Sequence, residues 1–96
     1  MSYAIQLSTE ARHHLARLSP ALRTQTLKQL DVLSEWATVL SIPSYFPFRE
    51  NCQLFLFDAI AEDGAEWDIN VMFQYGGDEH TIHILAIGFG RKPSDD

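Results

Sequence analysis

The sequence predicts an α+β fold, in which two helices pack on one face of an antiparallel sheet. Apolar residues in the first half of the chain recur at helical spacing, whereas three runs in the second half alternate in the manner of strands. Segments rich in Gly, Asp and Glu separate these runs, and such compositions are typical of hairpin turns. Helices gathered in one half and strands in the other indicate an α+β architecture.

The first half predicts a short strand followed by two helices. Residues 3–7 alternate in polarity, and Ser8 is typical of the residue that caps a helix start, here a helix of about ten residues. Pro20 directly after a serine is a strong start signal for a second helix over residues 20–40. The apolar positions along the two helices are Ala11, Leu15, Leu18, Leu22, Leu30, Leu33, Ala37 and Leu40.

The second half predicts a three-stranded antiparallel meander. Residues 41–51 contain two prolines and three aromatic residues, so they cannot continue the helix and form a long connection. The three strands are expected over residues 53–60, 66–75 and 79–88.

The middle strand indicates which side chains face the core. Its apolar members are Trp67, Ile69, Val71, Phe73 and Tyr75, and they alternate with Asp68, Asn70, Met72 and Gln74. A two-residue turn within residues 76–78 fixes the register of the last strand. That register predicts Ile82, Ile84 and Ala86 on the core face, and His83, Leu85 and Ile87 on the outer face.

Length and composition predict one domain over residues 1–92 with a short tail at 93–96. The 96 residues, 46% of them hydrophobic, suffice for one core and are too few for two ordinary domains. No apolar run approaches the roughly 20 residues that cross a bilayer, and the N-terminus does not resemble a signal peptide. We therefore expect a cytoplasmic protein without membrane contact.

From the positions of cysteine and histidine we expect no disulfide, no metal site and no cofactor. Cys52 is the only cysteine, so it has no partner within the chain. Side chains of His13 and His14 point about 100° apart on a helix, and those of His80 and His83 project to opposite faces of a strand.

The charge distribution argues against direct binding of nucleic acid. Residues 1–50 carry five Lys and Arg against four Asp and Glu, whereas residues 51–96 carry two against nine. Affinity for nucleic acid comes largely from cations that neutralise phosphates, so the acidic half repels such a ligand. The net charge of −6 favours a basic partner instead.

The order of predicted elements resembles the RelE/ParE superfamily of bacterial toxins. Two segments carry this resemblance, YAIQLSTEARHHLARLSPALRTQTLKQLDVL near the start and WDINVMFQYGGDEHTIHILAIGFGR near the end. Together with the region between them they span residues 3–91. Members of the superfamily cut mRNA on the ribosome or poison DNA gyrase, and they pair with an antitoxin.

The positions that carry catalysis in the RNA-cleaving toxins are degenerate here. Those toxins usually place an arginine on the third strand and basic or imidazole groups just beyond the final Ile-Gly, whereas this chain offers Asp68 and Asn70 on that strand. The remaining candidates for catalysis are His83, Arg91 and Arg49. Each has a plain alternative as a surface residue.

The outer face predicts a surface that binds a protein. Its expected members are Asp68, Asn70, Met72, His83, Leu85, Ile87 and Phe89. An antitoxin-like or basic segment would suit this mixture of apolar centre and acidic rim, and a homodimer is the alternative. Three functions stay open at this point: a toxin-like protein that acts by protein binding, an active ribosome-dependent mRNA endonuclease, and an unrelated small protein-binding domain.

Overall fold

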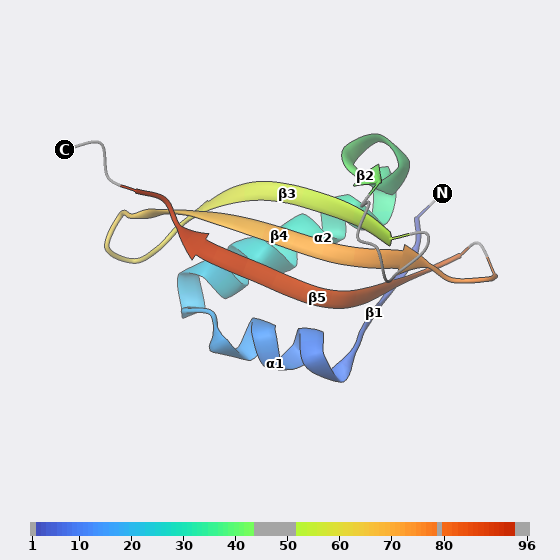
Figure 1. Cartoon of the computed structure of the whole chain (residues 1–96), viewed down its shortest axis with the longest axis horizontal. Helices are drawn as coiled ribbons and strands as arrows, with labels where there is room; N and C mark the ends of the chain where they lie inside the picture. The colour runs from blue at the N-terminus through green and yellow to red at the C-terminus, as the bar shows by residue number, and fades with distance from the viewer. Residues whose placement is uncertain (1, 44–51, 79, 94–96) are drawn as a thin grey trace.

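Two helices lie on one side of a five-stranded sheet in the computed structural model (Figure 1). The structure describes residues 2–43, 52–78 and 80–93. Its elements are β1 (Ala4–Leu7), α1 (Thr9–Arg17), α2 (Pro20–Leu40), β2 (Ile42–Pro43), β3 (Cys52–Ile60), β4 (Glu66–Tyr75) and β5 (Thr81–Arg91). The predicted α+β class and the succession of strand, helix pair and strands are confirmed. No helix within the described ranges is long and apolar enough to span a membrane.

The sheet is mixed, whereas the sequence predicted an antiparallel one. Its strand order is β1-β5-β4-β3-β2, and the strands β3, β4 and β5 pair antiparallel as expected. The first strand, however, lies parallel to the last, with Ala4 opposite Thr81 and Leu7 opposite Ile84. The two helices carry the chain from β1 at one edge of the sheet to β2 and β3 at the other, and β1 supplies one further row of backbone pairing beside β5.

Both helices begin at the predicted capping residues. The Ser8 hydroxyl accepts a hydrogen bond from the N–H of Ala11 (3.0 Å), and the Ser19 hydroxyl accepts one from the N–H of Leu22 (3.4 Å). Each serine thus pairs an N–H group that has no partner within the first turn of its helix. The Arg23 guanidinium donates to the carbonyl oxygens of Leu15 and Ala16 in the last turn of α1 and to that of Leu18, its C-cap residue, and so joins the two helices.

The core lies between the helices and the sheet, as the apolar pattern predicted. The expected residues that are buried are Ala11, Leu18, Leu22, Leu30, Leu33, Ala37, Ile69, Val71, Phe73, Ile82 and Ile84. Leu15 and Trp67 are partly buried against them. Leu40 departs from the predicted stripe and is exposed. It follows Trp36, where the backbone leaves helical geometry (φ −124°, ψ 24°) and α2 is kinked.

A β-bulge in β5 contradicts part of the prediction of which β5 side chains face the core. Met72 pairs with Ala86 and the next residue, Phe73, pairs with Ile84, so Leu85 is an additional residue in the strand. A bulge of this kind reverses the alternation of side chains beyond it. Ile87, which was expected on the outer face, is therefore buried in the core at 2% exposure, and Ala86 shares the outer face with Met72.

Candidate functional site

The outer face of the sheet, which points away from both helices, has an apolar centre. Residues directly opposite one another in an antiparallel pair share a face. The pairs that form this centre are Leu54 with Met72, Leu56 with Asn70, and Met72 with Ala86. Leu56 is 56% exposed, while Met72 and Leu85 are half-buried. The predicted positions of Asp68, Asn70, Met72, His83 and Leu85 agree with this geometry.

Small residues on β5 shape the outer face beside Asn70. Gly88 lies opposite Asn70, and a methyl group added at Gly88 would approach the Asn70 amide nitrogen to 2.6 Å. The amide of Asn70 therefore lies across the backbone of Gly88. Its hydrogen-bonding atoms are held at the border between the apolar centre and the acidic end of the face.

The acidic end of the outer face is organised around one lysine. The Nζ atom of Lys92 lies 2.9 Å from a carboxylate oxygen of Asp58, 3.7 Å from Asp68 and 3.9 Å from Glu66. The hydrogen bond to Asp58 raises the pKa of Lys92, with the nearby carboxylate charges adding to the effect. The same bond lowers the pKa of Asp58. We refer to these four residues as the Lys92 cluster.

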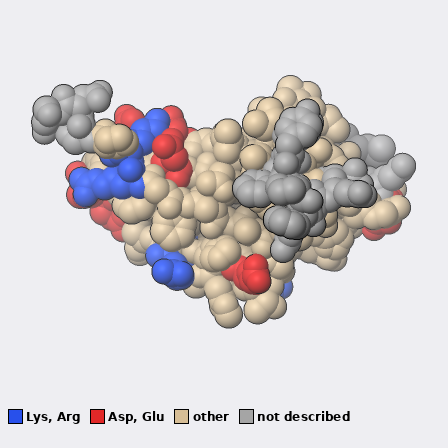
Figure 2. All heavy atoms as spheres, viewed as in Figure 1, with Lys and Arg blue, Asp and Glu red and all other residues tan. Residues whose placement is uncertain are grey.

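Arg91 leaves the strand on the opposite side from Lys92. It pairs with Trp67, whose side chain lies on the helix-facing side, and its guanidinium is 3.9 Å from an Asp63 carboxylate oxygen. Basic and acidic side chains consequently lie intermixed near the end of β5 (Figure 2). Both cations of this end of the sheet have carboxylate neighbours.

His83 lies at the other end of β5, beside the β4–β5 turn. It pairs with Gln74, and its imidazole packs close to Gly76, where an added methyl group would come within 3.0 Å of Nε2. Eight residues separate His83 from Arg91 along the strand, which corresponds to roughly 26 Å at the usual rise per residue. These two candidates therefore cannot act on one phosphodiester. Arg49, the third candidate, falls outside the described residues.

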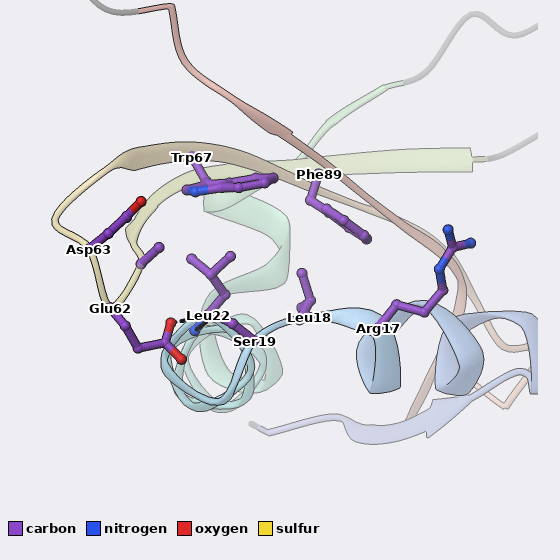
Figure 3. Close-up of a pocket in the computed structure, with 9 residues that line it drawn as sticks. Arg17, Leu18, Ser19, Leu22, Glu62, Asp63, Trp67 and Phe89 are labelled. Atoms are coloured by element: carbon purple, nitrogen blue, oxygen red, sulfur yellow. Dashed lines mark hydrogen bonds between the residues drawn. The ribbon is translucent and has the colours of Figure 1, made fainter.

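Phe89 lies on the helix-facing side, so the expectation that it borders the outer face is wrong. It pairs with the buried Ile69, and its ring lies 6.2 Å from that of Trp67, measured between centroids. The reversal of alternation at the bulge explains this position. Phe89 and Trp67 cover a pocket of about 390 Å³ whose floor includes Leu18 and Leu22 (Figure 3).

The rim of this pocket joins the start of α2 to the turn after β3. The Ser19 hydroxyl donates to a Glu62 carboxylate oxygen at 2.6 Å, and this hydrogen bond lowers the pKa of Glu62. The indole nitrogen of Trp67 is buried without a hydrogen-bond partner in the described structure. Sequence reasoning missed the pocket because segments more than 40 residues apart meet there.

The two neighbouring histidines of α1 have different surroundings. His13 is exposed, whereas the Nδ1 atom of His14 accepts a hydrogen bond from the N–H of Ile87 at 3.1 Å. The Ser8 hydroxyl donates to the carbonyl oxygen of Leu85 at 2.9 Å. The N-cap residue of α1 and its last turn thus contact β5 at the bulge residue Leu85 and just beyond it.

Several solved structures have a similar architecture. A chain of the RelBE2 toxin–antitoxin complex from Mycobacterium tuberculosis superposes with a TM-score of 0.66 at 19% identity, covering 91% of this chain and 96% of the other. Escherichia coli RelE, as an arginine double mutant in the free state, gives 0.64 at 13% identity, covering 92% and 83%. The intact E. coli RelBE complex gives 0.59 at 13% identity, covering 91% and 95%.

The sequence itself matches no family model and no curated protein. At these identities the structural likeness establishes the fold. The chain has the fold of the RelE toxins, as the order of its elements predicted.

Proposed function

We propose that this chain is a RelE-like toxin-family protein that acts by binding another protein and does not cleave RNA efficiently, either as a toxin component or as a repurposed relative. The observation that carries the proposal is the Lys92 cluster. Three carboxylates surround the one cation that the described part of the outer face presents. RNA cleavage requires that face to stabilise additional negative charge.

The electrostatic argument concerns the transition state. A ribonuclease develops a dianionic phosphorane, and positive donors that already point at it are the main means of stabilising that charge. In the Lys92 cluster the ammonium group is already satisfied by Asp58, and Asp68 would repel an incoming phosphate. His83 and Arg91 are too far apart to serve together as the acid and base of one cleavage reaction.

The apolar centre of the outer face supports a protein partner. Leu54, Leu56, Met72 and Leu85 form an apolar surface next to acidic side chains, and a segment with apolar residues and flanking lysines or arginines is complementary to it. Two of the similar structures are complexes of a toxin with its antitoxin. An antitoxin-like segment is therefore the partner that we propose for this face, ahead of a homodimer.

A translating extract tests the proposal directly. The purified full-length chain should leave ribosome-bound mRNA intact, and a filter-binding assay should detect no tight RNA complex at physiological salt. Specific cleavage products that disappear in His83→Ala or Arg91→Ala would overturn the proposal.

Protein binding is tested by light scattering. The protein is measured alone and after co-expression with the protein that the neighbouring gene encodes. A complex of defined mass should form and should be lost in Leu85→Glu, because a carboxylate there would be buried against apolar side chains. Circular dichroism should show an unchanged fold in that variant. A monomer that forms no such complex would count against protein binding.

A further inference from the structure

Exposed apolar side chains gather where α2 runs beside β3. Trp36 and Leu56 are each 56% exposed, and Val32 is 42% exposed. The exposed apolar residues of this side are Val32, Trp36, Val39, Ile42, Leu56 and Ile60. This side lies along the β3 edge of the sheet, and Leu56 belongs both to it and to the apolar centre of the outer face.

A side-chain amide occupies one end of the β3 edge. Gln25 donates from Nε2 to the carbonyl oxygen of Ile60 (2.6 Å) and accepts at Oε1 from the N–H of Ile60 (2.9 Å). A residue of a neighbouring strand would make the same two bonds. The N–H and C=O of Ile60 therefore point away from β4, toward the edge.

The rest of the edge follows from strand geometry. In an antiparallel strand the backbone groups of alternate residues point to the same side, so those of Asp58, Leu56 and Leu54 also point to the edge. Ile42 of β2 pairs with Leu54. Among the described residues nothing pairs with Leu56 and Asp58 on this side. In the part of the chain that the structure describes, an open section of two residues thus lies between the Gln25 amide and β2.

The helix forms the second wall of this open section. Gln25 contacts the Ile60 end of β3, and Ser41 donates to the Gln53 side chain at the other end (3.3 Å), so α2 runs antiparallel beside β3. Val32 and Trp36 lie within about 20° of Gln25 around the helix axis. They therefore flank the open section, and with Leu56 and Asp58 they define what we term the edge groove.

We propose that the edge groove accepts an extended segment of a partner protein as an additional strand beside β3. The backbone of that segment would pair with Leu56 and Asp58. Its inward side chains would be apolar and would cover Val32 and Trp36, which explains the exposure of a tryptophan at that position. The proposal rests on the proposed function only in taking the partner to be a protein.

Charge complementarity identifies the chemistry of the segment. The outward side chains of an added strand would lie beside Asp58 and the Lys92 cluster, where three carboxylates outnumber one ammonium group. A second copy of this chain, with its net charge of −6, would bring the same acidic side chains. A heterologous strand that alternates apolar residues with Lys or Arg is the complementary occupant.

A synthetic peptide of about nine residues with alternating Val and Lys is the probe. On binding to the isotope-labelled full-length protein it should slow hydrogen exchange at the amides of Leu56 and Asp58. N-methylation of those peptide residues that face β3 should abolish binding, whereas N-methylation of the residues between them should not. A peptide with Glu in place of Lys should bind at least about tenfold more weakly.

Matched variants separate the groove from the rest of the molecule. Trp36→Ala should weaken peptide binding by about tenfold or more. Leu27→Ala, at a position that is 45% exposed on the opposite side of α2, should leave it unchanged. Gln25→Ala should strengthen binding, because it frees the backbone of Ile60 for the added strand.

Three results would overturn the proposal that the edge groove accepts an added strand. They are absence of binding at millimolar peptide, binding that ignores N-methylation, and protection of Leu56 and Asp58 by self-association of the protein alone. Leu85→Glu should leave peptide binding intact. Loss of partner binding at the outer face is therefore observed separately from loss of peptide binding in the edge groove.

Discussion

His14 of α1 and Ile87 of β5 are joined by a hydrogen bond of 3.1 Å between the imidazole Nδ1 and the backbone N–H, across 73 residues of sequence. This bond holds the strand just beyond its bulge. His14→Ala should accelerate hydrogen exchange at the Ile87 amide and lower the free energy of unfolding by about 1 kcal/mol, measured by urea denaturation. His13→Ala is the matched control and should change neither. Equal effects of both substitutions would mean that the bond contributes nothing specific.

The core predicts a large effect of truncation at two paired positions. Phe73 and Ile84 lie opposite one another in β4 and β5 and are fully buried. Replacing either with Ala should lower the free energy of unfolding by about 2–5 kcal/mol, from lost transfer energy and the cavity left behind. Chemical denaturation measures this loss of stability, and the dependence of the unfolding free energy on denaturant concentration should be unchanged. A loss under about 0.5 kcal/mol at both would contradict the assigned core face.

The Lys92 cluster predicts a dependence of stability on pH. The folded pKa of Asp58 lies below its ordinary value of 3.8, chiefly because of the hydrogen bond from Lys92. The unfolded chain therefore binds the proton more readily, and the stabilisation is present above the ordinary value and disappears as pH falls through the folded pKa. Carboxyl titration by NMR should show the lowered pKa, and Lys92→Gln should return it toward the ordinary value. An Asp58 pKa that is unmoved by Lys92→Gln would contradict this pairing.

The contact between Gly88 and Asn70 predicts a compensating pair of substitutions. A methyl group in Gly88→Ala would come within 2.6 Å of the Asn70 side chain, which must rotate away. The single substitution should therefore destabilise the protein, and the double variant with Asn70→Ala should recover most of that loss. A double-mutant cycle on unfolding free energies measures the coupling. Additive effects would show that the amide does not lie over Gly88.

Local signals in the sequence predicted the helices well. Ser8 and Ser19 accept hydrogen bonds from the first turns of α1 and α2, as their capping chemistry requires, and both helices begin directly after them. The capping signals depend on residues that are neighbours in the chain. The two-residue turn predicted after β4 is wrong, because Tyr75 pairs with Ile82 and the Gly76 N–H donates to the Thr81 carbonyl oxygen. The register differs from the predicted one by an even number of residues, so Ile82 and Ile84 are still buried in the core as predicted.

The outer face was predicted only in part because the bulge has no local signal. Its position is held by Ser8, which contacts Leu85, and by His14, which contacts Ile87, across 77 and 73 residues respectively. Neither contact follows from alternation along β5. Met72 and Leu85 were therefore placed correctly, whereas Ile87 and Phe89, which lie beyond the bulge, were assigned to the wrong face.

The parallel pairing of β1 with β5 joins the first strand of the fold to the last. Ser8 N–H donates to the Ile84 carbonyl oxygen at 2.9 Å, and Ala4 N–H to that of His80 at 2.8 Å. These bonds close loops of more than 70 residues, and contacts of such long range slow folding. During synthesis on the ribosome, β1 and the apolar faces of both helices must wait for β5, the last strand to be made. Until β5 pairs, the edge of β4 remains open to other chains, so the nascent protein is most prone to aggregation just before its final strand appears.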